Sequence, residues 1–121
     1  MALLQWNCRG LKANRSDLDL LIAQYIPAII YLQDTLVHHT YHQFRSHVSY
    51  DLQATTDNLG RPHGGVSLLV GLKIPHHQIA LDTHLQAIAV QVTLHRTITV
   101  CSIYISPSQP CNIQDLDHLL Q

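Results

Sequence analysis

The sequence begins with two short apolar runs on either side of an amphipathic segment. The runs are residues 2–7 and 28–32, and the second is apolar at every position, as expected for a strand that is buried on both faces. Between them, apolar residues recur at the spacings of three and four that are typical of a helix: Leu18, Leu21, Ile22 and Tyr25. Pro27 ends this helix, and Asn14 or Ser16 is its expected cap. A strand, a helix and a strand in this order predict a right-handed crossover whose two parallel strands end on the same side of the molecule.

The rest of the chain has a mainly extended pattern. The polar segment 34–49 is expected to hold a short helix. The apolar pattern predicts a final helix capped by Asn112, preceded by strands at residues 50–55, 66–70, 77–81, 87–94 and 97–105. One crossover unit followed by several hairpin-like strands predicts an α+β fold.

The composition of the 121 residues narrows the class of protein. With 46% hydrophobic and 12% charged residues, the chain is expected to form one globular domain rather than a disordered segment. Seven basic and eight acidic residues give a net charge of −1, which disfavours a dedicated nucleic-acid binder. No apolar run reaches the roughly 18 residues that a membrane helix needs, so no membrane partner is expected. The protein is predicted to be intracellular, in the nucleus or the cytoplasm, and not secreted.

A carboxamide and a carboxylate are expected at the carboxyl ends of the two early strands. Asn7 ends the first strand, and Gln33 and Asp34 follow the second, at the edge where crossover units usually bind ligands. The oxygen atoms of these side chains suit a hard cation such as Mg²⁺ or Mn²⁺. An aspartate directly after a strand is also commonly a turn residue or a helix cap, so both interpretations of Asp34 stay open.

Four segments, in order along the chain, resemble those of a known superfamily. They are residues 6–11 (Trp-Asn-Cys-Arg-Gly-Leu), 27–35 (Pro-Ala-Ile-Ile-Tyr-Leu-Gln-Asp-Thr), 64–70 (Gly-Gly-Val-Ser-Leu-Leu-Val) and 98–107 (Ile-Thr-Val-Cys-Ser-Ile-Tyr-Ile-Ser-Pro). Their order and spacing are similar to the endonuclease/exonuclease/phosphatase superfamily. The resemblance is closest to the apurinic-like endonuclease domain at the start of jockey-type non-LTR retrotransposon polyproteins. Together the four segments are much more specific than any one of them.

This resemblance implies a fold, an activity and three site residues. The fold would be a four-layered α/β sandwich with two packed sheets, and the activity would be cleavage of DNA phosphodiesters with a divalent metal, Mg²⁺ or Mn²⁺. By the family's pattern, Asn7 would orient the metal and the scissile phosphate, and Tyr104 would contact that phosphate; on its own, Tyr104 is also an ordinary strand aromatic that packs. Position 34 would bind the metal, and Asp34 stands there where the family normally has glutamate.

The sequence departs from the family's pattern after the tyrosine strand. The family continues into a strand bearing Gly-Asp-x-Asn and later a Ser-Asp-His, whereas no Asp-x-Asn triplet occurs in this chain. Residues 1–121 are therefore expected to be about the N-terminal half of the family's domain, with impaired catalysis. An apolar sheet face left uncovered is expected to favour self-association. The alternative function is a non-catalytic remnant that binds a partner or self-associates.

Histidine, cysteine and arginine residues add further candidates. His38 or His39 would share a helix face with His42, which makes a histidine-based zinc site or pH-responsive binder a third hypothesis, against ordinary solvated loop histidines. Cys8 is expected to be a small buried residue rather than a nucleophile. Two arginines are expected on loops that flank a phosphate groove: Arg9 and Arg61.

Overall fold

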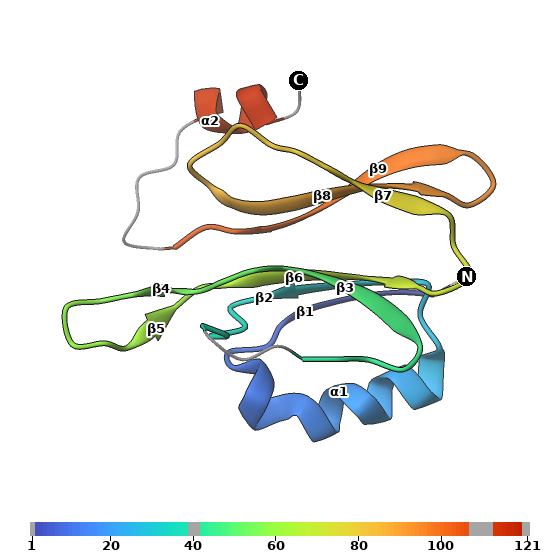
Figure 1. The fold of residues 1–121 in the computed structure, drawn as a ribbon, viewed down its shortest axis with the longest axis horizontal. Coiled ribbons are helices and arrows are strands. Elements are labelled where there is room, and N and C mark those ends of the chain that lie inside the picture. Colours follow the sequence, from blue (N-terminus) through green and yellow to red (C-terminus); the bar gives the residue numbers. More distant parts are fainter. Residues whose placement is uncertain (1, 39–41, 107–112, 120–121) are drawn as a thin grey trace.

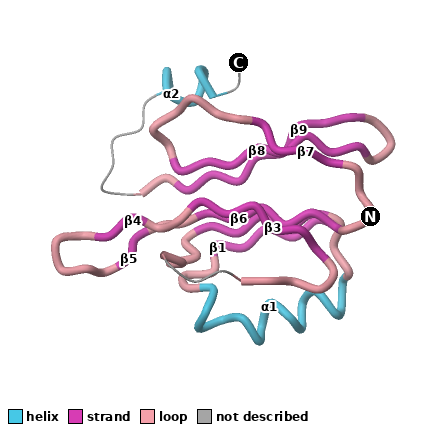
Figure 2. Tube along the Cα trace, viewed as in Figure 1, coloured by secondary structure: helices cyan, strands magenta, loops and turns pink. Residues whose placement is uncertain are grey.

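The computed structural model describes residues 2–38, 42–106 and 113–119, which form a mixed α+β fold (Figures 1 and 2). The described helices are α1 (Leu11–Tyr25) and α2 (Ile113–Leu119). The described strands are β1 (Leu3–Asn7), β2 (Ile29–Gln33), β3 (His47–Leu52), β4 (Thr55–Thr56), β5 (Pro62–His63), β6 (Val66–Gly71), β7 (His76–Ile79), β8 (Gln86–Thr93) and β9 (Thr97–Tyr104).

The strands form two main sheets and a small hairpin. The first sheet has the order β1-β2-β6-β3, the second has the order β7-β8-β9, and β4 pairs with β5. Strands β1 and β2 are parallel, with Asn7 opposite Gln33, and the other pairs are antiparallel. The parallel pairing predicted for the two early strands is therefore confirmed.

The two sheets stack on one another between the helices. Figure 1 shows α1 against the outer face of the first sheet, the second sheet on its other face, and α2 beyond the second sheet. One buried cluster, between α1 and the first sheet, contains Cys8, Leu11, Leu18, Ile30, Leu32 and Leu69. A second cluster, between the sheets, contains Ile29, Val66, Leu68, Val70, Ile88, Val90, Val92 and Val100. Strands β2 and β6 face both clusters, which explains why they are apolar at nearly every position.

The start of α1 differs from the prediction. The helix begins at Leu11 after Gly10, which has a φ of 112°, and no side chain caps it. The side chain of Asn14 instead donates to the carbonyl groups of Cys8 (2.8 Å) and Gly10 (3.0 Å). The predicted caps are wrong because a neighbouring loop satisfies the first helical donor: the Leu11 N–H donates to the Thr35 carbonyl at 2.8 Å.

The segment before β3 also differs from the prediction, since residues 34–38 and 42–49 contain no helix. Arg15 on α1 holds part of this segment, because its guanidinium donates to the Gln43 carbonyl at 2.7 Å and lies 4.0 Å from the centre of the Phe44 ring. Strand β3 begins at His47, whose buried ring bonds the Pro27 carbonyl through Nε2 and Ser46 through Nδ1, each at 2.7 Å. Such tertiary bonds outweigh local helix preference.

The face of β1 that is turned toward the second sheet is exposed. Strand β9 lies over β2 and β6, and the β1 residues that share a face with the inter-sheet cluster, namely Leu3, Gln5 and Asn7, are exposed. This face carries two amides beside Leu3, so it is only partly apolar. Self-association stays a prediction.

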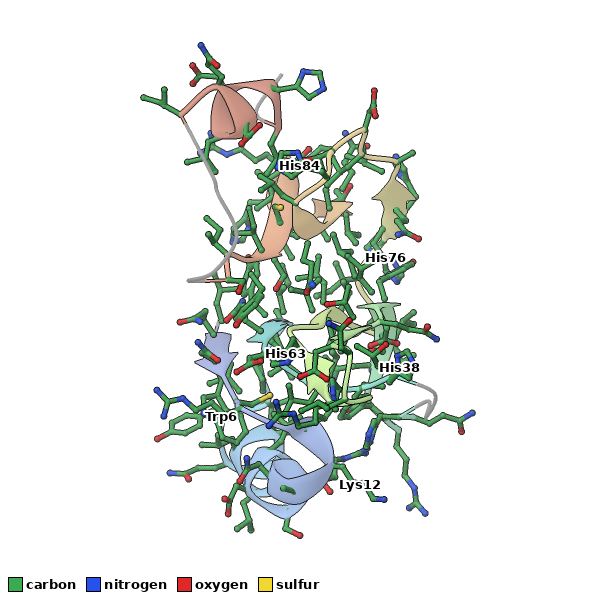
Figure 3. All side chains as sticks on the ribbon, turned by 90° about the vertical axis from the view of Figure 1, so that its left-hand side faces the viewer. Trp6, Lys12, His38, His63, His76 and His84 are labelled. Carbon is green, nitrogen blue, oxygen red and sulfur yellow. The ribbon has the colours of Figure 1, made fainter. Side chains whose placement is uncertain are left out.

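The outer helix α2 lies near the loop before β8, where His84 Nε2 approaches Asp115 Oδ2 at 3.6 Å (Figure 3). The predicted final helix is confirmed over Ile113–Leu119, while its predicted cap, Asn112, falls outside the described residues. Among the described residues, neither helix is long and apolar enough to cross a membrane.

Candidate functional site

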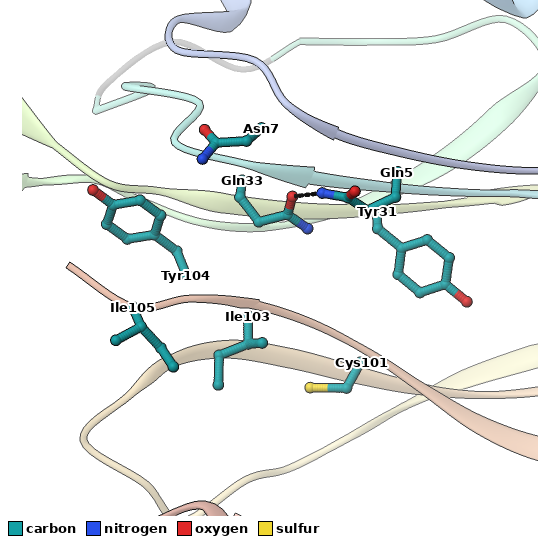
Figure 4. Close-up of a pocket in the computed structure, with 8 residues that line it drawn as sticks. All are labelled: Gln5, Asn7, Tyr31, Gln33, Cys101, Ile103, Tyr104 and Ile105. Atoms are coloured by element: carbon teal, nitrogen blue, oxygen red, sulfur yellow. Dashed lines mark hydrogen bonds between the residues drawn. The ribbon is translucent and has the colours of Figure 1, made fainter. Parts of the chain in front are cut away.

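A cavity of about 430 Å³ opens between the two sheets at the edge formed by β1 and β9 (Figure 4). Four of its lining residues come from the first sheet, and four come from β9 and the residue after it. They are Gln5, Asn7, Tyr31, Gln33, Cys101, Ile103, Tyr104 and Ile105. Two of the three predicted site residues, Asn7 and Tyr104, are thus brought to one cavity from opposite sheets.

Asn7 and Tyr104 reach the cavity because each is the last residue of its strand. The Asn7 side chain is on the exposed face of β1, and the Tyr104 side chain packs at the margin of the inter-sheet cluster. Figure 4 shows the Asn7 carboxamide and the Tyr104 ring on facing sheets, directed toward the space between them. A carboxamide and a phenol hydroxyl can each donate to a phosphate oxygen.

Asp34 does not line this cavity, although the residue before it, Gln33, does. Asp34 follows β2 directly and has a left-handed backbone with a φ of 55°, and its carbonyl accepts from the Gly10 N–H at 2.8 Å. Burial raises the pKa of the Cys8 thiol, and the negative charge of Asp34 raises it further. Cys8 is buried and its thiol donates to the Gln33 carbonyl at 3.5 Å, so its predicted role as a small buried residue is confirmed.

Three loops meet around Asp34, at residues 9–10, 34–36 and 64–65. We call this meeting point the left-handed junction, because several of its residues have a left-handed backbone. Arg9, Asp34 and Leu36 have φ values of 49°, 55° and 58° although none is a glycine. Backbone bonds join Thr35 to Gly65 (3.1 Å) and Leu36 to Gly64 (2.8 Å). Non-glycine residues in this conformation cost about 1–3 kcal/mol each and cluster at binding and catalytic sites, although Ile26 adopts it merely as the residue that ends α1. The junction was not predicted, because only aspartate among the three tolerates this conformation well enough to signal it.

A groove of about 710 Å³ adjoins the junction on the α1 side. Arg9, Lys12, His38 and His42 line it, so the predicted position of Arg9 beside a groove agrees with the structure. Burial and the positive charge of Arg15 lower the pKa of His42. Arg9 and Lys12 bring two positive side chains to the groove.

The histidines do not form the predicted zinc site in the described part of the chain. Residues 34–38 and 42–46 are not helical, and His39 falls outside the described residues. His38 Nδ1 bonds the Ala54 carbonyl at 3.1 Å, and Arg15 bonds His42 Nδ1 at 3.3 Å. No three histidine, cysteine or acidic residues gather at one point among residues 2–38, 42–106 and 113–119.

The β4–β5 hairpin carries an aspartate–histidine pair that was not predicted. Asp57 Oδ2 accepts from His63 Nε2 at 2.9 Å and from Arg61 Nε at 3.1 Å, while Oδ1 accepts from the backbone N–H groups of Leu59 and Arg61, each at 2.9 Å. These bonds, led by that from His63, hold the pKa of Asp57 well below its usual range. Both residues border a small cavity that reaches Tyr104. Arg61, predicted to flank a phosphate groove, is paired with Asp57 instead.

The hairpin is expected to loosen in acid. Because the pKa of Asp57 is lower in the folded than in the unfolded chain, its contribution is complete above the unfolded value of 3.8 and is lost as the pH falls through the folded value. Between about pH 5 and about pH 2, the protection factors of the Leu59 and Arg61 amides, which correct for slower intrinsic exchange in acid, should fall more than those of core amides. Asp57→Asn should show low protection factors at these two amides at both pH values; unchanged protection of the wild type in acid would contradict the prediction.

No protein-family model matches this chain, and no curated protein matches it. The function is therefore inferred from the site. The cavity offers an amide and a phenol for phosphate oxygens, and Asp34 adds one carboxylate at the adjoining junction. These are hard oxygen donors, which fit a cation such as Mg²⁺ that is held by one or two carboxylates and keeps several waters.

Proposed function

We propose that this chain forms the metal- and phosphate-binding part of a DNA phosphodiesterase of the endonuclease/exonuclease/phosphatase type. The observation that carries the proposal is the meeting of Asn7 and Tyr104 at one cavity, next to the left-handed junction that holds Asp34. The order of layers supports it, since α1, the two sheets and α2 follow one another as in a four-layered α/β sandwich (Figure 1).

Each of the three residues has a separate role in the proposed site. Asp34 would hold Mg²⁺ or Mn²⁺, and the bound ion would polarise a phosphoryl oxygen and offset its negative charge. The Asn7 carboxamide orients the phosphate and the waters around it, and the Tyr104 hydroxyl donates to a non-bridging phosphate oxygen from the other sheet. Aspartate is shorter than the family's glutamate by one methylene, so Asp34 is suited to binding through a water molecule.

The groove lined by Arg9 and Lys12 would bind the proposed DNA strand next to the site. Arg9 and Lys12 line the groove, and Arg9 is itself part of the junction next to Asp34. Two permanent positive charges suit neighbouring phosphates of one strand. The charge of the whole chain is −1, so the attraction comes from this local arrangement rather than from net charge.

Cleavage by the 121 residues alone is expected to be weak. The chain contains no Asp-x-Asn triplet, which in the family positions the attacking water. Each missing proton-transfer group typically lowers the rate by about 10²–10⁴-fold. Metal binding is therefore the more sensitive measurement of the proposed site.

The proposal predicts that Asp34→Asn weakens Mn²⁺ binding by about tenfold or more, since it removes the carboxylate charge that holds the ion. Titration calorimetry with Mn²⁺ measures this, and nicking of supercoiled plasmid with Mg²⁺ or Mn²⁺ measures any cleavage. Asp17→Asn is the matched control, because Asp17 is exposed on α1 and the charge change is the same. Equal Mn²⁺ affinity in wild type and Asp34→Asn would reject the site, and so would nicking that persists in the variant.

A further inference from the structure

A chain of side-chain hydrogen bonds joins the two sheets beside the candidate site. Gln5 Nε2 donates to Gln33 Oε1 at 2.5 Å, Gln33 Nε2 donates to Ser102 Oγ at 3.0 Å, and Ser102 Oγ donates to the Leu32 carbonyl at 3.1 Å. Gln33 is 8% exposed and Ser102 is 1% exposed. Gln33 therefore uses both ends of its buried amide, with β1 on one side and β9 on the other (Figure 4).

These hydrogen bonds favour one position of β9 over β2, which the apolar contacts between the sheets do not do. The remaining inter-sheet cluster consists of valine, leucine and isoleucine, and burial of such side chains is non-directional. A buried amide left unpaired costs about 1–3 kcal/mol, so a small shift of β9 over β2 that breaks the Gln33–Ser102 bond is opposed.

A second polar link lies at the opposite edge of the two sheets. The Tyr50 hydroxyl on β3 bonds His76 Nδ1 on β7 at 2.8 Å, and their rings are 5.5 Å apart and nearly perpendicular. His76 lies at the level between the sheets (Figure 3). Strands β3 and β7 are the edges farthest from β1 and β9. With both links in place, directional bonds hold the sheets together at two opposite edges. Without the Gln33–Ser102 bond, we expect the edge that carries Asn7 and Tyr104 to rotate about the edge held by Tyr50 and His76.

We propose that Gln33 is the positioning residue of the candidate site, through its bond to Ser102; this inference rests on the proposed function. Gln33 is the strand partner of Asn7, and Ser102 is two residues before Tyr104 on the same face of β9. The bond therefore joins the strand partner of Asn7 to the residue two positions before Tyr104 on β9. It sets the separation over which a phosphate can contact both Asn7 and Tyr104.

The test uses a double variant, Gln33→Leu with Ser102→Ala. Replacing both partners of a buried hydrogen bond by apolar groups is often nearly neutral for stability, so the chain is expected to fold. Residual dipolar couplings measure the orientation of β8 and β9 relative to β1 and β2. We expect the orientation to change in the double variant and to stay as in the wild type in Tyr50→Phe, which removes only the distant hydrogen bond. Ser102→Ala alone breaks the same link and is the second variant if the first does not fold.

Binding is measured separately with Mn²⁺ alone. In the wild type, Mn²⁺ should broaden the NMR signals of both Asn7 and Tyr104. In the double variant, broadening should stay the same at Asn7 and weaken at Tyr104, because the paramagnetic effect falls steeply with distance. An unchanged sheet orientation with lower stability would overturn the positioning role and leave a merely structural one. No broadening in the wild type would reject the proposed metal site, whereas the couplings would still decide the role of Gln33.

Discussion

Leu68→Ala is expected to lower the free energy of unfolding by about 2–5 kcal/mol. Leu68 is fully buried in β6, between the two sheets, where its side chain contacts the inter-sheet cluster. Removing the side chain loses its burial and leaves a cavity that two paired sheets cannot easily close, because β6 is hydrogen-bonded on both sides by β2 and β3. Urea titration followed by circular dichroism measures the change.

The matched control is Leu59→Ala. Leu59 is the same residue type, but it is 75% exposed at the tip of the β4–β5 hairpin. Its removal should change stability by no more than about 0.5 kcal/mol. If the two variants lost similar stability, or if Leu68→Ala lost less than about 1 kcal/mol, the packing of the two sheets described above would be wrong.

Gly65→Ala is expected to cost about 2–4 kcal/mol and to disturb the junction that holds Asp34. Gly65 has a φ of 91°, and an added Cβ would collide with Thr35 Oγ1 and lie 3.3 Å from the Ala54 backbone nitrogen. Thr35 is 2% exposed and its Oγ1 accepts from the Val37 N–H at 3.4 Å, so moving Oγ1 aside would break this bond inside a closely packed region. Thermal unfolding measures the loss, and Mn²⁺ titration measures the effect on the site.

The control variant Gly60→Ala separates the cost of left-handed backbone strain from the cost of a steric collision. Gly60 has a similar φ of 77°, but a Cβ there would meet no atom within 4 Å. Only the left-handed strain remains, which costs about 1–2 kcal/mol. Gly60→Ala should therefore be milder than Gly65→Ala and should leave Mn²⁺ binding unchanged. Equal losses in the two variants would mean that the Thr35 contact is unimportant.

The parts of the fold that can be predicted from the sequence are those decided by apolar pattern. The run 28–32 is apolar throughout because β2 is covered on both faces, and Pro27 ends the helix before it whatever the tertiary structure. The start of α1 could not be predicted, because its first donor is satisfied by Thr35, a residue of another loop. Likewise, β3 begins at His47 because the ring meets Pro27, a contact that local spacing does not reveal.

The residues of the candidate site also divide into those that the sequence pattern places and those that only the tertiary structure brings together. Asn7 and Asp34 can be placed at the ends of neighbouring strands from the crossover pattern, and Tyr104 was added by resemblance to a family. Gln33 and Ser102 are 69 residues apart, and their bond depends on how the sheets stack. Asp57 and His63 form a pair only because a short hairpin brings them together. Such pairings need the tertiary structure.

The left-handed junction affects the order in which the parts of the molecule fold. Its backbone bonds join residue 10 to Asp34, and residues 35 and 36 to Gly65 and Gly64, so the complete junction requires three distant segments to be in place. Closing these long loops costs chain entropy before the contacts offset it, which slows folding. We therefore expect the strained site to form late, together with the closed sheet, so that a partly folded or nascent chain has no binding site to offer.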